Sequence, residues 1–164
     1  MSSSDQTVSW RDLLIEATLA FRTAGLEQAA IDARRVVEQA SGADPSELIL
    51  VLDDPVTERS MSSFELLVRR RSAGEPLQYV LGSWSFRSLD LMVDSRVLIP
   101  RPETEAVVEV ALAELDRLGA QDRTCQVVDL GTGSGAIGLS IAVERVRTQV
   151  MLTDQSPEAL QVAR

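Results

Sequence analysis

Histidine is absent from the 164-residue chain, and cysteine occurs once, at position 125. The lack of imidazole excludes Ser-His-Asp triads, histidine bases and nearly all zinc sites. One cysteine cannot form an internal disulfide, so we expect Cys125 to be a small buried residue at the edge of a strand. The sequence therefore predicts no metal site, and its cysteine usage is consistent with a reducing cytoplasm.

Basic residues and long apolar runs are also scarce. The chain has 25 Asp and Glu against 16 Lys and Arg, which gives a formal net charge of −9. This balance argues against direct nucleic-acid binding, which needs a basic surface. No apolar run approaches the ~20 residues of a membrane span, and the N-terminal sequence lacks the pattern of a signal peptide. We expect a cytoplasmic monomer without membrane contact.

Apolar residues make up 45% of the chain, and in its first part they recur at helical spacing. We expect residues 1–73 to form a small helical bundle. The first helix begins at the N-cap Ser9, with Asp12 three residues later. The further helices are expected over residues 27–40, in the segment DPSELIL entered through Pro45, and over residues 57–71.

Residues 74–100 are predicted to form a β-hairpin linker, with Arg87 and Ser88 near the turn. Residues 101–164 then read as helix, strand, glycine-rich loop, helix, strand and helix, which is the opening of a parallel α/β sheet. Two strands with their helices cannot bury both faces of such a sheet. We therefore expect the chain to be the front part of a longer protein.

The glycine-rich loop is the candidate ligand site. Four glycines follow the predicted strand at positions 131, 133, 135 and 138, within VVDLGTGSGAIGLSIA (127–142). Their spacing satisfies the dinucleotide pattern G-x-G-x-x-G/A in two registers, and Asp154 follows about twenty residues later. The same spacing fits S-adenosylmethionine, so the glycines alone do not decide the ligand.

Asp129 distinguishes the two ligands. It lies two residues before the first glycine, where we expect it to face the cofactor. A carboxylate there would repel the pyrophosphate of a dinucleotide. S-adenosylmethionine carries a sulfonium and an ammonium group instead, which Asp129 would stabilise, and Asp154 would accept both ribose hydroxyls. The charge pattern favours S-adenosylmethionine; the alternative is that Asp129 caps a local turn.

Several segments together resemble one family. VLIPRPETE (97–105), the glycine segment and VMLTDQSPEALQVAR (150–164) closely resemble the N5-glutamine methyltransferases of peptide chain release factors, the HemK family. GEPLQYVLGSWSF (74–86) resembles the segment that precedes them in that family. The resemblance implies a helical N-terminal bundle that docks the substrate. It also implies a hairpin linker and the start of a Rossmann-like, S-adenosylmethionine-dependent methyltransferase domain.

The resemblance also implies a reaction and its site. A methyl group would pass from S-adenosylmethionine to the side-chain amide nitrogen of the glutamine in the Gly-Gly-Gln motif of bacterial class I release factors. The implied cofactor-binding residues are Asp129, Gly131, Thr132, Gly133, Ser134, Gly135 and Asp154. A possible pocket wall is formed by Arg101, Pro102, Glu103 and Thr104. For Arg101 and Glu103, a salt-bridged linker is the alternative role.

One family motif does not occur in this sequence. The family's catalytic Asn-Pro-Pro-Tyr, whose asparagine and proline carbonyl fix the substrate amide, is absent from the 164 residues. The sequence thus holds no catalytic residue that we can name, and we expect the chain alone to be inactive. The alternatives are an N-methyltransferase acting on another protein or nucleic-acid amine, and a non-catalytic fragment that binds a release factor. The run Arg69 to Arg71 is interpreted as a solvated helix end, or as a contact for an acidic partner.

Overall fold

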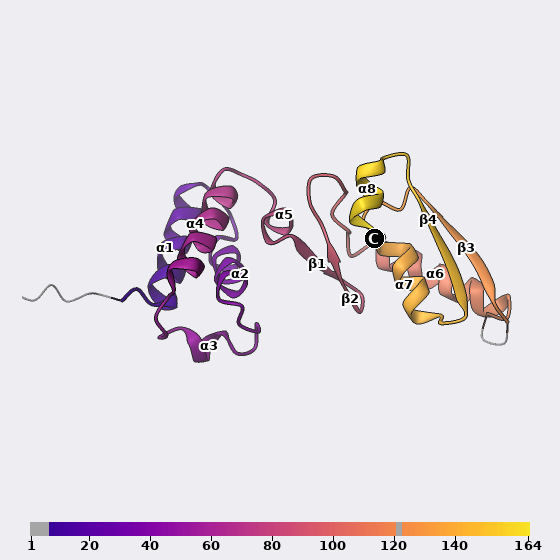
Figure 1. Cartoon of the computed structure of the whole chain (residues 1–164), viewed down its shortest axis with the longest axis horizontal. Helices are drawn as coiled ribbons and strands as arrows, with labels where there is room; N and C mark the ends of the chain where they lie inside the picture. The colour runs from indigo at the N-terminus through magenta and orange to yellow at the C-terminus, as the bar shows by residue number, and fades with distance from the viewer. Residues whose placement is uncertain (1–6, 121–122) are drawn as a thin grey trace, which may run out of the picture. The chain divides into compact units, whose positions relative to one another are not determined.

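A computed structural model describes residues 7–120 and 123–164. The contacts divide the chain into two compact units, a helical unit of residues 1–81 and an α/β unit of residues 82–164 (Figure 1). The division thus falls after Leu81, whereas the sequence places its boundaries after residues 73 and 100. None of the helices in the described ranges combines the length and the apolar character that a membrane span requires.

The helical unit contains five helices among its described residues. They are α1 (Trp10–Thr23), α2 (Ala29–Ser41), α3 (Leu48–Val51), α4 (Glu58–Ser72) and α5 (Leu77–Leu81). The predicted start of α1 is confirmed, because Ser9 and Asp12 form a complete capping box. Thr57 caps α4 by accepting a hydrogen bond from the Ser60 N–H.

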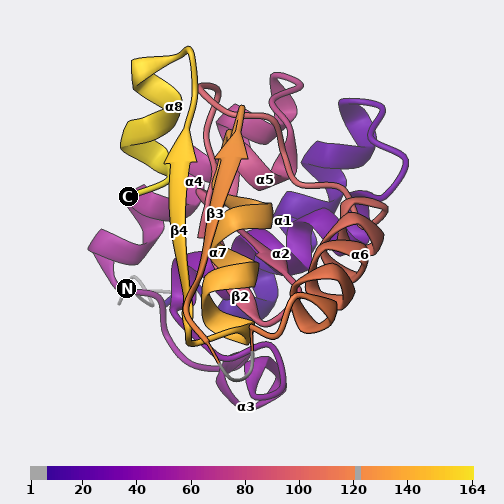
Figure 2. The ribbon, with the colours of Figure 1, turned by 90° about the vertical axis from the view of Figure 1, so that its right-hand side faces the viewer.

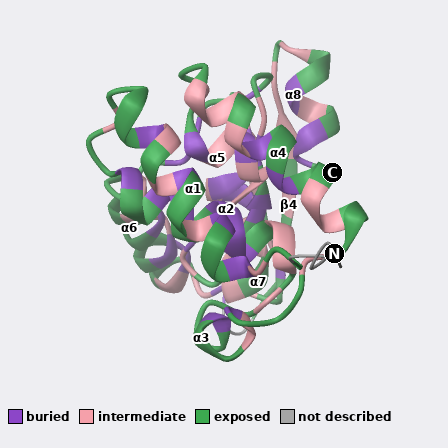
Figure 3. Cartoon of the chain, turned by 90° about the vertical axis from the view of Figure 1, so that its left-hand side faces the viewer, coloured by how far each residue is buried: buried purple, intermediate pink, exposed green. Residues whose placement is uncertain are grey.

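The core of the helical unit forms along the apolar faces of α1, α2 and α4. Buried residues of these helices are drawn in purple in Figure 3. The buried set includes Trp10, Leu13, Ala17, Phe21, Ala33, Val36, Val37, Phe64 and Leu67. These side chains recur every three or four residues, which is why the helical period could be read from the sequence.

Two short helices of this unit differ from the sequence prediction. In DPSELIL the helix begins at Leu48 rather than at Pro45, because the Asp44 carboxylate accepts hydrogen bonds from the N–H and hydroxyl of Ser46 and holds a turn there. Helix α5 lies inside the segment expected to be only a hairpin linker. Its Leu77 and Val80 are buried in the helical core, which places it in this unit.

The arginine run at the end of α4 is largely committed to contacts inside the helical unit. Arg70 donates to both carboxylate oxygens of Glu75, at 2.6 and 2.8 Å, and to the Tyr79 carbonyl at 2.9 Å. Arg71 pairs with the buried Asp32 of α2 at 2.8 Å. Only Arg69 of the three is an exposed residue, so the run is neither a simple solvated end nor a free basic patch.

The α/β unit begins with the predicted hairpin and continues with the predicted alternation. Its elements are β1 (Ser83–Phe86), β2 (Leu89–Met92), α6 (Thr104–Arg117), β3 (Cys125–Leu130), α7 (Ala136–Glu144), β4 (Thr148–Thr153) and α8 (Pro157–Val162). Strands β1 and β2 pair antiparallel. Strands β3 and β4 pair in parallel from Cys125 opposite Thr148 to Leu130 opposite Thr153, with α7 behind them in Figure 2.

Arg87 joins the hairpin to two helices of the same unit. It occupies the turn with a left-handed φ of 52°, which is unusual for a residue with a side chain. Its guanidinium pairs with Glu109 of α6 and Glu144 of α7, each at 2.6 Å. Its backbone N–H donates to Glu105 at 3.2 Å. The carboxylates of Glu144 and Glu109 raise the pKa of Arg87. Together the three contacts fix the hairpin against α6 and α7.

Candidate functional site

The glycine-rich loop lies where parallel sheets bind ligands. It follows the carboxyl end of β3, and Asp154 follows the carboxyl end of the neighbouring strand β4. Parallel strands bring their carboxyl ends to the same edge of a sheet. The N–H groups of Gly131 and Thr132 both donate to the Thr153 carbonyl, at 2.8 and 2.9 Å, which holds the loop against the end of β4.

The loop needs glycine for its backbone conformation. Gly131, Gly133 and Gly135 have φ values of 75°, 55° and 85°, in the left-handed region that residues with a Cβ rarely adopt. A Cβ at Gly131 or Gly133 would meet no atom within 4 Å, so open space borders the loop at these two positions. Thr132 and Ser134 alternate with them and are buried. The loop therefore presents backbone, not side chains, to a ligand.

Asp154 fixes the loop from the β4 side. One carboxylate oxygen accepts a hydrogen bond from the Gly133 N–H at 2.9 Å, and the other accepts from the Ser156 N–H at 2.9 Å. The N–H of Ser156, and then that of Gly133, lower the pKa of Asp154, which is therefore ionised at neutral pH. Each carboxylate oxygen has a second acceptor position. The side chain is partly exposed and can still accept hydroxyl groups of a ligand.

Asp129 has a more local role than the sequence analysis expected. Its Oδ2 accepts hydrogen bonds from the Gly138 N–H at 2.9 Å and from the Thr132 hydroxyl at 2.7 Å. The carboxylate thus lies on the side of β3 that faces α7, against the first turn of that helix. This is the capping arrangement that the sequence left as the alternative, and a carboxylate is well placed there because helix N-termini are electropositive.

The N–H groups open to an anionic ligand group lie at the end of the loop. Within the described residues, Gly131, Thr132, Gly133 and Gly135 donate their N–H groups to protein acceptors. Among the same residues, no acceptor pairs with the N–H groups of Ser134, Ala136 or Ile137. Ala136 and Ile137 belong to the first turn of α7, where N–H groups have no partner inside the helix. These three N–H groups are therefore available to donate to an anionic group.

Gly138 belongs to the glycine-rich segment, but the sequence analysis did not place it among the cofactor-binding residues. A Cβ at this position would lie 2.9 Å from Asp129 Oδ2 and would overlap Leu152 of β4. The lack of a side chain lets α7 approach β3 and β4 closely enough for the Asp129 contact. The available signal was its place as the third glycine in one register of the G-x-G-x-x-G pattern, where helix–strand packing requires glycine.

The proposed pocket-wall residues form the turn into α6. The N–H of Thr104 donates to the Arg101 carbonyl at 3.0 Å, and the N–H of Glu105 donates to the Pro102 carbonyl at 3.0 Å. Arg101, Pro102 and Glu103 are exposed. In the described part of the chain, neither Arg101 nor Glu103 forms an ion pair, and no hydrogen bond joins this turn to the glycine-rich loop. A role for these residues at the cofactor stays a prediction.

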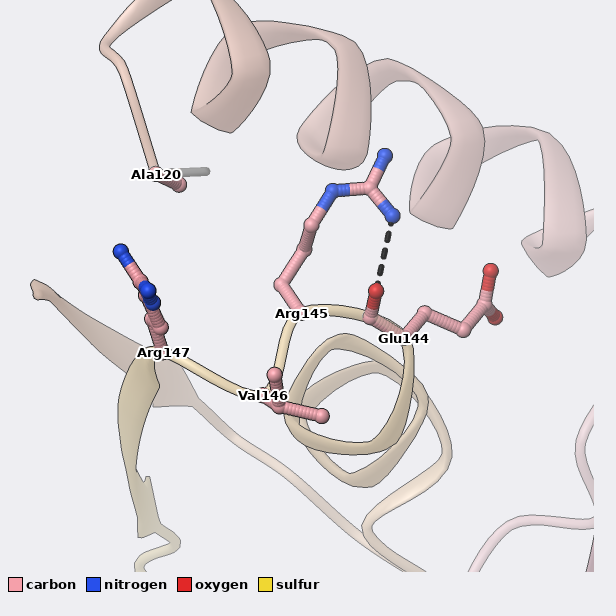
Figure 4. Close-up of a pocket in the computed structure, with 5 residues that line it drawn as sticks. All are labelled: Ala120, Glu144, Arg145, Val146 and Arg147. Carbon is pink, nitrogen blue, oxygen red and sulfur yellow. Dashed lines mark hydrogen bonds between the residues drawn. The ribbon is translucent and has the colours of Figure 1, made fainter. Parts of the chain in front are cut away.

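The α/β unit also has a hollow at the other end of its strands, away from the glycine-rich loop. It is lined by Ala120 and residues 144–147, which connect α7 to the start of β4 (Figure 4). Arg145 donates there to the Glu144 carbonyl at 2.8 Å and pairs with Asp116 at 2.7 Å. Because β4 begins at this end, the hollow is separate from the glycine-rich loop at the strands' carboxyl ends.

Comparison with known proteins assigns the family. The PrmC N-terminal domain matches residues 12–82, and the methyltransferase small domain matches residues 109–164. A protein of Xylella fastidiosa named release factor glutamine methyltransferase is 44% identical over 146 residues, which cover 88% of this chain and 52% of that protein. The chain belongs to the release factor glutamine methyltransferase family. Its fold is therefore that of a helical N-terminal domain followed by the start of a methyltransferase domain, as expected.

Two other members of the family match the chain with similar identity. A protein of the same name from Vibrio cholerae is 42% identical over 156 residues, covering 92% of this chain and 52% of that protein. Another from Bacillus subtilis is 41% identical over 123 residues, which cover 75% of this chain and 43% of that protein. The chain thus spans about half the length of the curated relatives that it matches.

We expect the substitution Gly138→Ala to destabilise the α/β unit by about 1–3 kcal/mol, the range for overpacking a filled interior. The added Cβ would force apart Asp129 and Leu152. Urea unfolding monitored by circular dichroism measures the change.

The matched control is Val143→Ala, an exposed position on the same helix. It should change the unfolding free energy by no more than about 0.5 kcal/mol. Equal effects of the two substitutions would contradict the close approach of α7 to β3 that we describe.

Proposed function

We propose that the protein takes part in methyl transfer from S-adenosylmethionine to a glutamine side-chain amide in the Gly-Gly-Gln motif of a class I release factor. Family membership supports a methyltransferase, and the names of the relatives support this acceptor. The observation that carries the donor assignment is the open glycine-rich loop between two strand-end carboxylates, Asp129 and Asp154. S-adenosylmethionine supplies a methyl group activated by its sulfonium centre.

The residues of the loop fit this donor in three ways. The ionised Asp154 would accept the ribose hydroxyls on the free acceptor positions of its two oxygens. The N–H groups of Ser134, Ala136 and Ile137 would bind the carboxylate of the methionine portion. Space beside Gly131 and Gly133 would let the ligand approach the backbone.

Asp129 favours S-adenosylmethionine over a dinucleotide through its charge at the start of α7, without touching the ligand. Its carboxylate already accepts the Gly138 N–H in the first turn of α7 and offsets part of the positive potential there. A pyrophosphate carries two negative charges, so Asp129 would weaken its binding at the N-terminus of α7 more than it would weaken the binding of a ligand carboxylate, which carries one. The charge of Asp129 therefore still favours S-adenosylmethionine over a dinucleotide, although its side chain is turned toward α7.

The acceptor half of the reaction needs groups that the 164 residues do not include. An amide nitrogen is a poor nucleophile because its lone pair is delocalised into the carbonyl. In the family, Asn-Pro-Pro-Tyr positions that nitrogen, and this motif does not occur in the sequence. We infer that this chain holds the donor, and that methyl transfer also requires the residues that grip the glutamine.

A second candidate is binding of a release factor without catalysis. The helical unit has a surface depression on α1 lined by Leu14, Ile15, Thr18, Leu19 and Arg22. Ile15 and Leu19 are large apolar residues exposed to solvent. Such a surface favours contact with another protein.

Isothermal titration calorimetry of the chain with S-adenosylmethionine tests the donor assignment, with NAD as the comparison ligand. We expect binding of S-adenosylmethionine only, weakened at least about tenfold in Asp154→Ala, since a tenfold loss corresponds to about 1.4 kcal/mol. Asp90→Ala, which removes an exposed aspartate from β2, should bind normally. NAD binding, or unchanged affinity in Asp154→Ala, would refute the assignment.

Methylation assays test the acceptor. The chain would be joined to the part of the Xylella fastidiosa relative that lies outside the match, and incubated with a release factor and S-adenosylmethionine. We expect mass spectrometry to place one methyl group on the glutamine of Gly-Gly-Gln, with none added by the chain alone. Methylation of a different residue by the joined protein would exclude the proposed acceptor.

A further inference from the structure

Arg87 occupies a position that favours glycine. The hairpin turn consists of Arg87 and Ser88, and the φ of 52° at Arg87 is adopted more readily by a residue without a Cβ. The Arg87 side chain is only 14% exposed, and its Nε and Nη2 donate to the Glu144 carboxylate at 2.6 and 2.8 Å. Its Nη1 pairs with Glu109 at 2.6 Å. The side-chain contacts, and not the turn conformation, therefore explain an arginine at this position.

The two carboxylates that pair with Arg87 come from different helices and differ in exposure. Glu144 ends α7, has a side chain that is 24% exposed, and accepts from two N–H groups of the guanidinium. Glu109 lies within α6, has a side chain that is 64% exposed, and pairs with one nitrogen. A partly buried, bidentate pair is stronger than a pair in contact with water. The pair with Glu144 is therefore the stronger one, and it joins the hairpin to α7.

The Glu144 pair acts at the end of α7 that lies away from the glycine-rich loop. The nine residues of α7 span about 13 Å. Near its first turn, the Gly138 N–H donates to Asp129, and the N–H groups of Ala136 and Ile137 have no acceptor among the described residues. A helix that is fixed near one end can still tilt, so the contacts at its far end determine its direction.

Two ion pairs hold that far end. Arg145, directly after α7, pairs with Asp116 of α6 at 2.7 Å, and Glu144 pairs with the hairpin through Arg87. Figure 4 draws the side chains of Glu144 and Arg145 leaving the end of α7 in different directions. The Arg87 pair therefore restrains the helix in a direction that the Arg145 pair does not.

We propose that Arg87 is a positioning residue for donor binding. By holding Glu144 it fixes the direction of α7, and with it the N–H groups of Ala136 and Ile137 that would receive the ligand carboxylate. Arg87 itself would touch no ligand, because it contacts the opposite end of the helix. The inference rests on the proposed function for the identity of the donor, and it adds the hairpin turn to the elements that determine the donor's affinity.

A double-mutant cycle on the affinity for S-adenosylmethionine tests this proposal. Arg87→Gly removes the guanidinium and suits the left-handed turn, and Glu144→Gln removes the charge of its partner. Measured by isothermal titration calorimetry on the folded chains, each substitution should weaken binding at least about threefold. The double variant should bind no more weakly than the single ones, because all three lack the same contact.

The matched control is Glu109→Gln, which removes the charge of the other carboxylate at the same guanidinium and leaves the pair with Glu144. It should bind S-adenosylmethionine as tightly as the unsubstituted chain. The proposal is overturned if the single variants bind normally, if their losses multiply in the double variant, or if Glu109→Gln loses as much affinity as Glu144→Gln.

A second readout needs no ligand. In NMR spectra of the free chain, the amide signals of Ala136 and Ile137 should be displaced in Arg87→Gly and in Glu144→Gln, and displaced alike in the double variant. They should stay in place in Glu109→Gln. If the unsubstituted chain binds no S-adenosylmethionine, the proposed function fails, while displaced signals still support the positioning of α7 by Arg87. Signals that stay in place in both single variants would overturn it.

Discussion

The glycine-rich loop depends on two carboxylates that accept hydrogen bonds from its backbone. Asp129, near the end of β3, accepts from Gly138 and so fixes the start of α7. Asp154, after β4, accepts from Gly133 and fixes the loop itself. Three left-handed glycines make the loop conformation possible, and these two contacts select it from the many conformations that glycine permits. The space for a ligand is a consequence of this arrangement.

Arginine ion pairs also hold α7 in place, at the end of the helix that lies away from the glycine-rich loop. The sequence contains no lysine, so every side-chain ion pair among the described residues uses a guanidinium, which can bind two carboxylates at once. Arg87 uses this capacity to hold Glu109 and Glu144 together and thereby fixes the far end of α7. The helix that presents the candidate ligand-binding N–H groups is thus held at both ends.

Much of the fold could be predicted because local chemistry determines it. The capping box of Ser9, the hairpin turn at Arg87 and the α8 cap at Ser156 are each decided by residues a few positions apart. Helix α5 was missed because Leu77 and Val80 are buried by residues distant in the sequence. The direction of the Asp129 side chain could not be predicted either, because it depends on how closely Gly138 lets α7 approach. The family was recognisable because its motifs are contiguous.

An NMR titration of Asp154 tests the central claim that its carboxylate holds the loop. Backbone N–H groups, above all that of Ser156 and then that of Gly133, lower its pKa in the folded protein. Its contribution to stability is therefore complete above the unfolded value of about 3.9 and is lost as the pH falls through the lower folded value. We predict that the Asp154 carboxyl signal and the Gly133 amide signal titrate together, with a midpoint below that of the urea-unfolded chain. A midpoint equal to or above the unfolded value, or a Gly133 signal that does not follow the carboxyl, would contradict the account.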